Sequence, residues 1–293
     1  MKAVRTISEL REHIQHLKNS SDLSTVGLVP TMGYLHQGHA SLISAARGKS
    51  DIVVVSIFVN PIQFGPGEDF ETYPRDEDRD LAVAEAAGAD LVFLPSVDVM
   101  YPKPTKTKVA VSEVTSGLCG ASRPGHFDGV TTVVSKLFHI VQPNHAFFGM
   151  KDAQQVAVIE QMVFDLNFNV TIVPCPIIRE EDGLALSSRN VYLSPEERSQ
   201  ALVLSRSLRE TKNALEIGQI RTAGEARELL VKIIGESSIA VIDYTEVMAF
   251  PELSQLADGS KVLEQGESVL MALAVNFGKT RLIDNCLIHP KGE

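Results

Sequence analysis

The feature that most constrains the fold is a series of short, continuously apolar segments separated by stretches with helical periodicity. The clearest segment is IVVVSIFV, Ile52–Val59. A run of this length without polar alternation is typical of a parallel strand that is buried on both faces. The same pattern predicts further strands at Val26–Pro30, Leu91–Leu94, Ala146–Phe148 and Val170–Ile178.

The stretches between these strands predict helices that connect them. They are His39–Lys49, Arg75–Ala87, Gly129–Val141 and Asp152–Leu166. Apolar strands that alternate with helices indicate an α/β fold, with a Rossmann-like parallel sheet and helices on both faces. We place this domain at residues 1–180.

The pattern changes in residues 181–293. Ser194 and Pro195 form a strong helix start, with Ser194 as the N-cap and Pro195 at the first helical position. This helix is predicted to run to about Leu215, and a second helix follows Thr222. Apolar runs at Ile239–Val247 and Ser268–Val275 predict a small sheet. We therefore expect a smaller C-terminal α+β domain.

The charge balance narrows the function classes. The chain has 27 Lys and Arg against 37 Asp and Glu, a net charge of −10, which argues against nucleic acid as the main partner. No apolar run approaches the length that spans a bilayer. The chain starts without an apolar signal segment, and its three cysteines lie far apart in the sequence. We expect a cytoplasmic globular protein with no membrane or nucleic-acid partner.

The segment PTMGYLHQGH, Pro30–His39, lies between the first predicted strand and the helix that follows it. Ligands of open α/β sheets bind at the carboxyl ends of strands, where helix N-termini attract phosphate. Gly33 and Gly38 allow the backbone to approach a ligand closely. His36 and His39 can donate hydrogen bonds to a phosphate that gains negative charge during a reaction.

Spacing alone leaves three interpretations of this segment open: a nucleotide site, a structural turn and a metal site. A helical zinc site prefers histidines at i and i+4 with a third ligand, and the i, i+3 pair fits that poorly. The strand is not followed by G-x-G-x-x-G, and the chain contains no G-x-x-x-x-G-K-[ST] motif.

A family resemblance favours the nucleotide site. His36-Gln37-Gly38-His39 resembles the H-x-G-H signature of the nucleotidyltransferase superfamily, which also contains class I aminoacyl-tRNA synthetases. The longer string Pro30–His39 resembles the narrower pantothenate synthetase (pantoate–β-alanine ligase) family. Further blocks that fit this family follow in order at Asn60–Phe64, Tyr73–Arg75, Gly120–Gly129, Phe148–Gln155, Asp182–Asn190 and Arg281–Asn285.

The resemblance implies an AMP-forming ligase that joins pantoate to β-alanine through an amide bond. The implied substrates are ATP with Mg2+, pantoate and β-alanine, and the implied intermediate is pantoyl adenylate. Because an acyl adenylate must be shielded from water, residues 181–293 are expected to act as a lid. The family is commonly dimeric, so a homodimer is expected.

The resemblance also implies roles for individual residues. The implied catalytic residues are His36, His39, Lys151, Ser187, Ser188 and Arg189. The implied ATP site adds Met32, Gly33, Tyr34, Leu35, Gln37, Gly38, Gly149, Met150, Asp152, Ile178 and Leu186. Pantoate or β-alanine is assigned to Pro30, Thr31, Gln63, Arg123 and Gln155, and the magnesium of MgATP to Asp80.

The residue types suit these roles, with two departures from the family pattern. Two hydroxyls followed by a guanidinium at Ser187–Arg189 form a phosphate clamp comparable to the K-M-S-K-S loop of tRNA synthetases. Arg123 can bind a carboxylate through two parallel hydrogen bonds. Relatives usually carry an acid where this chain has Met150, and they can carry a second acid where it has Arg79.

Two other functions share parts of this pattern. One is an H-x-G-H nucleotidyltransferase that transfers a nucleotidyl group without an amine acceptor. The other is a non-catalytic nucleotide sensor on an α/β scaffold. Pantoate-dependent exchange of pyrophosphate into ATP distinguishes the first from the ligase, and release of AMP in the presence of all the substrates excludes the second.

Overall fold

The computed structural model describes residues 1–20 and 25–290. The chain divides into two compact units. Unit 1 comprises Met1–Met150 and Val158–Pro176, and unit 2 comprises Lys151–Ala157 and Ile177–Glu293. Residues 151–157 group with unit 2, although they fall within the segment that the sequence assigns to the N-terminal domain.

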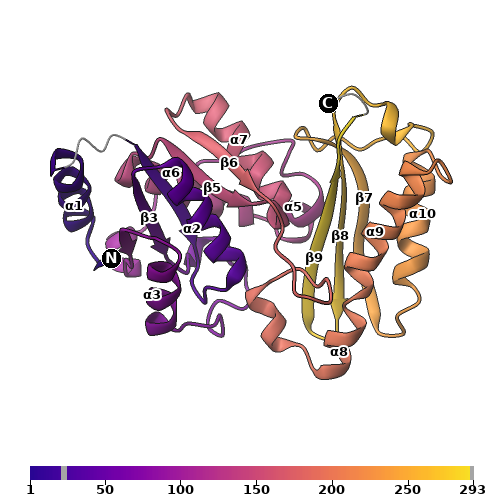
Figure 1. Ribbon diagram of the computed structural model, residues 1–293, viewed down its shortest axis with the longest axis horizontal. Coiled ribbons are helices and arrows are strands. Elements are labelled where there is room, and N and C mark those ends of the chain that lie inside the picture. The colour runs from indigo at the N-terminus through magenta and orange to yellow at the C-terminus, as the bar shows by residue number, and fades with distance from the viewer. Residues whose placement is uncertain (21–24, 291–293) are drawn as a thin grey trace. The chain divides into compact units, whose positions relative to one another are not determined.

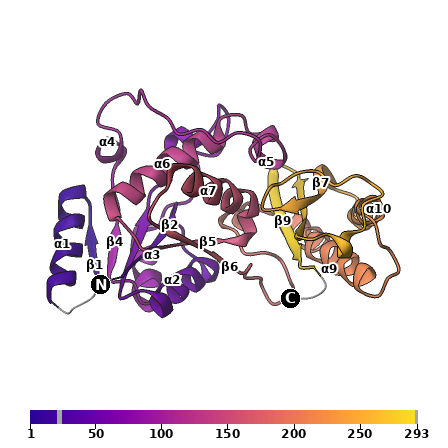
Figure 2. The ribbon, with the colours of Figure 1, turned by 90° about the horizontal axis from the view of Figure 1, so that it is seen from above.

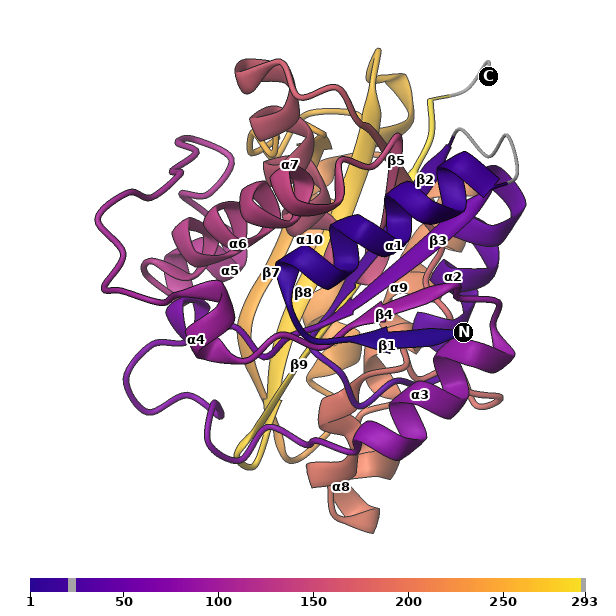
Figure 3. The ribbon, with the colours of Figure 1, turned by 90° about the vertical axis from the view of Figure 1, so that its left-hand side faces the viewer.

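Unit 1 is built on a parallel sheet. Its strands are β1 (Lys2–Val4), β2 (Val26–Thr31), β3 (Ile52–Ile57), β4 (Leu91–Phe93), β5 (His145–Gly149) and β6 (Thr171–Cys175). Their order is β1-β4-β3-β2-β5-β6, and all of these pairings are parallel. Figure 3 shows β1, β4 and β3 side by side. The predicted Rossmann-like α/β class is confirmed.

Helices cover both faces of this sheet. They are α1 (Ile7–Ser20), α2 (Gln37–Lys49), α3 (Glu77–Ala86), α4 (Val97–Met100), α5 (Leu118–Ser122), α6 (His126–Val141) and α7 (Ala153–Leu166), whose first turn belongs to unit 2. Figure 2 shows α2 and α6 on opposite faces. Ile43 of α2 packs with Val55 and Phe147 of the sheet in a fully buried core. These helices explain why the strands are apolar on both sides.

The strand order creates a ligand-binding position in unit 1. From β2, the chain adds β3 and β4 on one side, whereas β5 and β6 lie on the other side. Neighbouring strands β2 and β5 therefore flank a topological switch point, where open α/β sheets bind ligands at the carboxyl ends of their strands. The segment Pro30–His39 leaves β2 at this edge, and Gly149 ends β5 there.

Unit 2 contains an antiparallel sheet and a helical layer. The strands β7 (Ala240–Phe250), β8 (Ser268–Phe277) and β9 (Thr280–Ile288) pair in that order. Helices α9 (Val203–Glu216) and α10 (Ala223–Ile234) pack on one face, as Figure 1 shows. Alternate β8 residues, Val269 to Phe277, join Leu204 and Leu230 in the core between sheet and helices. The predicted smaller α+β fold is confirmed.

One helix prediction in unit 2 is wrong in its extent. The helix expected from Ser194 to about Leu215 is split into α8 (Pro195–Gln200) and α9. Ser194 is the N-cap of α8, as predicted, and forms a capping box with Glu197. The split occurs at a tight turn in which the N–H of Leu204 bonds to the carbonyl of Ala201 at 3.1 Å. No breaker residue marks this turn in the sequence.

Among the described residues, no helix combines the length and apolarity needed to cross a membrane. Five α-helices and strands among the described residues were not predicted from the sequence: β1, α1, α4, α5 and β9. The last of these matters for the site, because β9 contains the Arg281–Asn285 block.

Candidate active site

His36 and His39 lie at the N-terminus of α2 and fix each other's orientation. His36 is the N-cap, and its Nδ1 accepts a hydrogen bond from the backbone N–H of Gly38 at 3.1 Å. The Nδ1 of His39 accepts from the backbone N–H of His36 at 3.3 Å. Because both Nδ1 atoms act as acceptors, each neutral imidazole carries its proton on Nε2. The two ring centroids are 4.1 Å apart, so one helix end supplies two imidazole donors.

This capping changes the expected chemistry of the helix terminus. α2 begins at Gln37, two residues earlier than predicted. The N–H of Gly38, a glycine expected to let the backbone approach a ligand, is bonded to the imidazole of His36. This amide is therefore engaged within the helix cap.

The backbone between β2 and His36 has a strained shape that Asp80 of α3 holds. Gly33 and Tyr34 have φ angles of +88° and +52°, in the left-handed region. The carboxylate of Asp80 accepts the N–H of Tyr34 at 2.8 Å and that of Leu35 at 2.5 Å. A Cβ on Gly33 would lie 2.9 Å from Oδ2 of Asp80, so only glycine fits. The guanidinium of Arg79 lies 4.5 Å from the ring centroid of Tyr34.

The environment of Asp80 does not fit the predicted magnesium ligand. The residue is 2% exposed, and burial raises the pKa of its carboxyl above the usual range. Both oxygens already accept backbone N–H groups. Among the described residues, no group of three or more His, Cys, Asp or Glu side chains is arranged to hold a metal ion. In this structure Asp80 supports the loop.

Gln63, predicted to contact pantoate, is held in a buried hydrogen-bond chain after β3. It ends the short 3-10 helix Pro61–Gln63 and is 8% exposed. Its Oε1 accepts from Nδ2 of Asn60 at 3.0 Å, and its Nε2 lies 3.2 Å from the sulfur of Met32. The hydroxyl of Tyr101 donates to Oδ1 of Asn60 at 2.8 Å. Burial raises the pKa of Tyr101 to about 12, so this hydroxyl remains a donor at neutral pH.

The backbone of this segment is fixed by α6. The Nδ1 of His126 bonds to the carbonyl of Gln63 at 2.8 Å, which makes Nδ1 the protonated nitrogen. Nδ2 of Asn60 also donates to the carbonyl of Gly129 at 3.1 Å. A Cβ on Gly129 would lie 2.5 Å from Cα of Gln63. The close approach of α6 to Gln63 therefore requires glycine.

Arg123 binds a carboxylate through two hydrogen bonds, as its chemistry predicts, but the carboxylate is Glu68 of the same unit. Nε and Nη2 of Arg123 donate to the two oxygens of Glu68 at 2.8 and 2.6 Å. Nη1 of Arg123 lies 3.1 Å from Nε2 of His126. The hydrogen bond from Arg123 lowers the pKa of Glu68. With its fork occupied, Arg123 is placed to support His126 and, through it, Gln63.

The remaining unit 1 residues of the predicted site lie in and around the β2 loop. Thr31 is buried and donates through Oγ1 to the carbonyl of Ser56 at 2.8 Å. Its Oγ1 also accepts from the N–H of Gly33 at 3.3 Å. Pro30, Met32 and Gly149 are half-buried, whereas Gln37 is exposed. Thr31 thus shapes the loop from the strand side.

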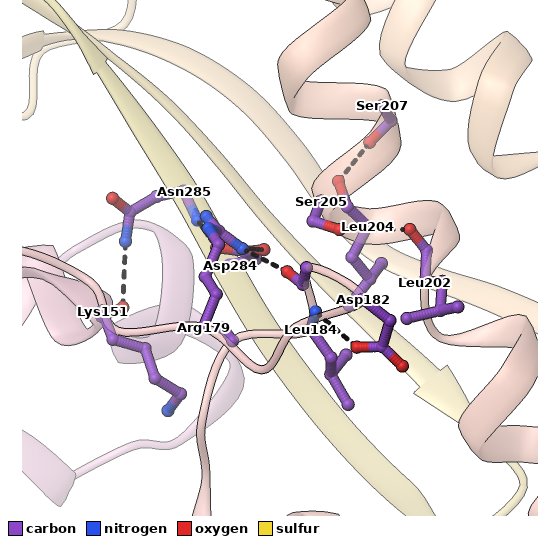
Figure 4. Close-up of polar contacts among 12 residues, drawn as sticks. Lys151, Arg179, Asp182, Leu184, Leu202, Leu204, Ser205, Ser207, Asp284 and Asn285 are labelled. Carbon is purple, nitrogen blue, oxygen red and sulfur yellow. Dashed lines mark hydrogen bonds and ion pairs between the residues drawn. The ribbon is translucent and has the colours of Figure 1, made fainter. Parts of the chain in front are cut away.

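Lys151, Asp152 and Gln155 lie at the start of unit 2. Met150–Asp152 forms a short 3-10 helix that leads into α7. Nζ of Lys151 is 3.9 Å from Oδ2 of Asp152, and the Lys151 side chain is 20% exposed. Gln155 is half-buried in the first turn of α7. The carbonyl of Lys151 accepts a hydrogen bond from Nδ2 of Asn285 at 2.9 Å (Figure 4).

The predicted clamp Ser187–Arg189 follows a tight hairpin. The N–H of Leu186 donates to the carbonyl of Ile178 at 3.0 Å, and that of Glu180 donates to Leu184 at 2.8 Å. Ser187 then caps the 3-10 helix Ser188–Tyr192, accepting from the N–H of Arg189 at 3.3 Å. Ser188 is 8% exposed. We call residues 178–190 the clamp segment.

Lys151 and Ser187 come together within unit 2. Both line a cavity of about 10 Å3, together with Leu184, Ala185, Asn190, Leu204 and Leu282–Asp284. Such a small volume means that the Lys151 segment, the clamp segment and β9 are closely packed. Two of the predicted phosphate ligands are therefore held in one framework.

Comparison with known proteins identifies the family. The family model described as Pantoate-beta-alanine ligase matches residues 2–287. The chain belongs to the pantoate-beta-alanine ligase family.

Relatives and solved structures of pantoate-beta-alanine ligases agree over the whole length. The pantothenate synthetase of Acetivibrio thermocellus is 56% identical over 99% of this chain and 100% of its own. The crystal structure of pantothenate synthetase from Thermus thermophilus covers 99% of this chain and 100% of its own, with 45% identity and a TM-score of 0.89. The ligase from Francisella tularensis, complexed with Beta-gamma ATP and Beta-alanine, covers 98% of this chain and 97% of its own, at 34% identity and a TM-score of 0.78.

Several residues that organise the site of this pantoate-beta-alanine ligase family member were not predicted from the sequence. Glu68 and Tyr101 are distant in sequence from the groups they hold, and so is Asp284, although it lies in the Arg281–Asn285 block. His126 and Asn285 lie within the family-like blocks, and that membership was the available signal. Their contacts depend on the tertiary fold, which no spacing in the sequence encodes.

Proposed function

We propose that this chain condenses pantoate with β-alanine at the expense of ATP, forming pantothenate, AMP and pyrophosphate. The observation that carries the proposal is the match to the pantoate-beta-alanine ligase family over residues 2–287. The Francisella ligase supports it, because that protein is complexed with Beta-gamma ATP and Beta-alanine. The proposed adenylate and the residue roles below extend this to mechanism.

In the first step, a carboxylate oxygen of pantoate attacks the α-phosphorus of ATP. The bond between the α-phosphorus and the bridging oxygen breaks, and pyrophosphate leaves with that oxygen. The nucleophile is already ionised, so this step needs placement and charge stabilisation more than a base. Nε2–H of His36 and of His39 are suited to donate to the phosphate oxygens, because capping fixes their tautomer and direction.

Unit 2 supplies the other proposed phosphate ligands. Lys151 contributes a cation, and Ser187, Ser188 and Arg189 contribute hydroxyls and a guanidinium. Asp152 and Gly149 are proposed near the ribose, and the loop Met32–Leu35 with Ile178 and Leu186 near the rest of the nucleotide. Lys151 and Ser187 line one small cavity of unit 2, which supports placing them near each other.

Gln63 and Gln155 are proposed to hold pantoate, with Pro30 and Thr31 beside it. The amide of Gln63 is pre-oriented by Asn60 and Met32, which lowers the entropy cost of positioning the substrate. In the second step, the amine nitrogen of β-alanine attacks the acyl carbon. The carbon–oxygen bond to AMP breaks, AMP leaves with that oxygen, and the proton lost by the amine passes to solvent. Arg123 is proposed to support Gln63 through His126.

ATP is proposed to bind as its magnesium complex. The hydrogen bonds of Asp80 do not support it as the ligand of that ion, so no step is assigned to Asp80 beyond holding the loop. The homodimer and the cytoplasmic location stay predictions from the sequence.

We propose that residues 181–293 act as a lid on bound ATP, because an acyl adenylate must be protected from water. Small-angle scattering tests this directly. Compaction of the protein on adding ATP and pantoate is expected, and an unchanged radius of gyration would contradict the lid.

The function is tested by product analysis with the purified chain. ATP, pantoate and β-alanine together should give equal amounts of AMP and pantothenate, and omission of any one should give neither product. A nucleotidyltransferase without an amine acceptor would release pyrophosphate but make no pantothenate. A nucleotide sensor would bind ATP without turnover. Either result would overturn the proposal.

A further inference from the structure

We propose that Asp284 and Asn285 of β9 are positioning residues for ATP. Asp284 holds the clamp segment and Asn285 holds the Lys151 segment, so that one strand fixes both groups of unit 2 phosphate ligands. The inference rests on the proposed function for its link to ATP. The anchoring itself rests on contacts within unit 2.

Asp284 anchors the clamp segment through Arg179. Nη1 and Nη2 of Arg179 donate to the two oxygens of Asp284 at 2.7 and 2.9 Å. Nη1 also donates to the carbonyl of Gly183 at 3.1 Å, across the hairpin turn. Figure 4 shows Arg179 directed toward Asp284. A bidentate pair fixes direction as well as distance, which a single contact does not.

Asn285 anchors the second segment from the other side of the strand. Its Nδ2 donates to the carbonyl of Lys151 at 2.9 Å (Figure 4). This bond holds the backbone of Lys151, and the side-chain Nζ, which lies 3.9 Å from Oδ2 of Asp152, takes no part in it. The N–H of Asn285 also donates to Oδ1 of Asp284 at 2.8 Å. The two anchors are therefore linked to each other.

Asp284 and Asn285 are both buried, so each needs a hydrogen-bond partner within the protein. Asp284 is 2% exposed and Asn285 is 5% exposed. Neighbouring residues of a strand point to opposite faces, and Leu282 and Ile288, on the face of Asp284, belong to the apolar core under α9. A carboxylate in that row is costly unless it is paired. The Arg179 pair offsets the cost and ties the clamp segment to the core.

The consequence for ATP follows from how closely the parts pack. Lys151, Ser187 and Asp284 line one cavity of about 10 Å3, so the Lys151 segment, the clamp segment and β9 adjoin one another. Loss of either anchor should displace phosphate ligands rather than remove them. A displacement of about 1 Å in a group that orients a substrate can cost roughly 100-fold in rate.

The experiment compares Asp284→Asn, Asn285→Ala and a matched control, Asp243→Asn. Asp243 also pairs with an arginine of β9, Arg281, at 2.7 Å, but its side chain is 28% exposed and holds no part of the clamp segment. Steady-state assays give kcat and KM for ATP and for pantoate. Hydrogen exchange of peptides covering residues 178–190 and 150–155 reports the anchoring without reference to activity.

We expect Asp284→Asn to lower kcat/KM for ATP roughly 10- to 100-fold while KM for pantoate stays unchanged. Exchange should become faster in residues 178–190 for Asp284→Asn and in residues 150–155 for Asn285→Ala. Asp243→Asn should match the wild type in every measurement. Normal ATP kinetics and normal exchange in both anchor variants would overturn the proposal.

Two further results keep the test decisive. If Asp284→Asn does not fold, Arg179→Lys replaces it, because lysine keeps the charge but loses the guanidinium fork. We again expect kcat/KM to fall for ATP and not for pantoate. An equal fall for both substrates would contradict a positioning role. If the wild type makes no pantothenate, the proposed function fails. The exchange data still decide whether β9 anchors the two segments.

Discussion

Two buried aspartates, Asp80 in unit 1 and Asp284 in unit 2, each hold a segment that carries candidate site residues, but they do so differently. Asp80 accepts two backbone N–H groups of a loop that has left-handed residues. Asp284 accepts the guanidinium fork of Arg179 from a regular hairpin. The first carboxylate holds a strained backbone, and the second orders a segment through a side-chain ion pair.

The two aspartates differ in the free-energy cost of burying their charge. Burial raises the pKa of Asp80, which means that its charge is held at a free-energy cost. The loop held at this cost leads into the start of α2, where His36 and His39 lie in fixed tautomers. Asp284 has its counter-charge within the same unit, so its burial is compensated. Anchors of the first kind should respond most to loss of an acceptor oxygen, and anchors of the second kind to loss of the bidentate geometry.

The largest expected effect comes from the histidine that the Asp80 loop delivers. In His39→Asn, the side-chain oxygen can replace Nδ1 as acceptor for the His36 N–H, but the Nε2 donor is lost. We expect kcat to fall about 100- to 1000-fold, as for removal of one transition-state donor, with little change in the melting temperature. Steady-state assays and thermal unfolding check this.

The control for His39 is His16→Ala, because His16 is exposed on α1. Turnover within the same range as the control in a folded His39→Asn protein would show that the loop does not deliver a catalytic donor. The comparison between the two anchors would then lose its functional meaning.

The next effect tests Asp80 itself. Asp80→Asn removes the charge and points an amide group at one of two N–H donors. We expect a loss of about 1–3 kcal/mol in the free energy of unfolding and a fall in kcat of roughly 10- to 100-fold. Asp78→Asn, an exposed position of the same helix, is the control. Excess Mg2+ should not restore activity, and restoration would favour the magnesium role instead.

The pH dependence of stability tests the buried charge of Asp80 independently of activity. Because the folded-state pKa of Asp80 is raised, the native state holds this proton more tightly than the unfolded state. Its contribution to stability should therefore decline as pH rises from below the unfolded pKa through the folded pKa. Chemical unfolding across this range should therefore show that the free energy of unfolding of the wild type, relative to that of Asp80→Asn, declines as pH rises.

A third change separates the pantoate side from both anchors. In Gly129→Ala, the new Cβ must push α6 away from Gln63, because it would lie 2.5 Å from that Cα. Overpacking of this kind costs about 1–3 kcal/mol, and KM for pantoate should rise several-fold without a change in KM for ATP. The control is Gly48→Ala, since nothing lies within 4 Å of a Cβ there. Equal changes for both substrates would contradict separate support of Gln63.

The smallest effect is expected at Glu68. Glu68→Gln removes the charge that pairs with Arg123, at a pair whose side chains are 25% and 19% exposed. We expect a loss of about 1 kcal/mol at neutral pH and a rise of about two-fold in KM for pantoate. Because the pKa of Glu68 is lowered, the stabilisation should vanish as pH falls through the folded pKa, opposite in sign to Asp80. A pH-independent difference between the two proteins would contradict this pairing.

The sequence predicted the parts of the fold that follow from local pattern. Continuous apolar runs marked the central strands. Several motifs follow the carboxyl ends of these strands, as Pro30–His39 follows β2. α1 could also have been read, because Ile7, Leu10 and Ile14 have helical spacing. The break between α8 and α9 could not, since its residues favour helix and only tertiary packing divides them.

The sequence could not predict what the site residues bind inside the protein. Arg123 looked like a substrate ligand because its partner, Glu68, lies 55 residues away. β9 was missed because Asp284 and Asn285 interrupt its apolar pattern with the polar pair that anchors the site. The positions that violate the strand pattern are thus those with a positioning role, which is where local rules are expected to fail.

The most direct test of the account is exchange of labelled pyrophosphate into ATP in the absence of β-alanine. The account predicts exchange that depends on pantoate, because pantoyl adenylate forms reversibly before the amine enters. Exchange without pantoate, or none with pantoate from a protein that makes pantothenate, would contradict the adenylate mechanism.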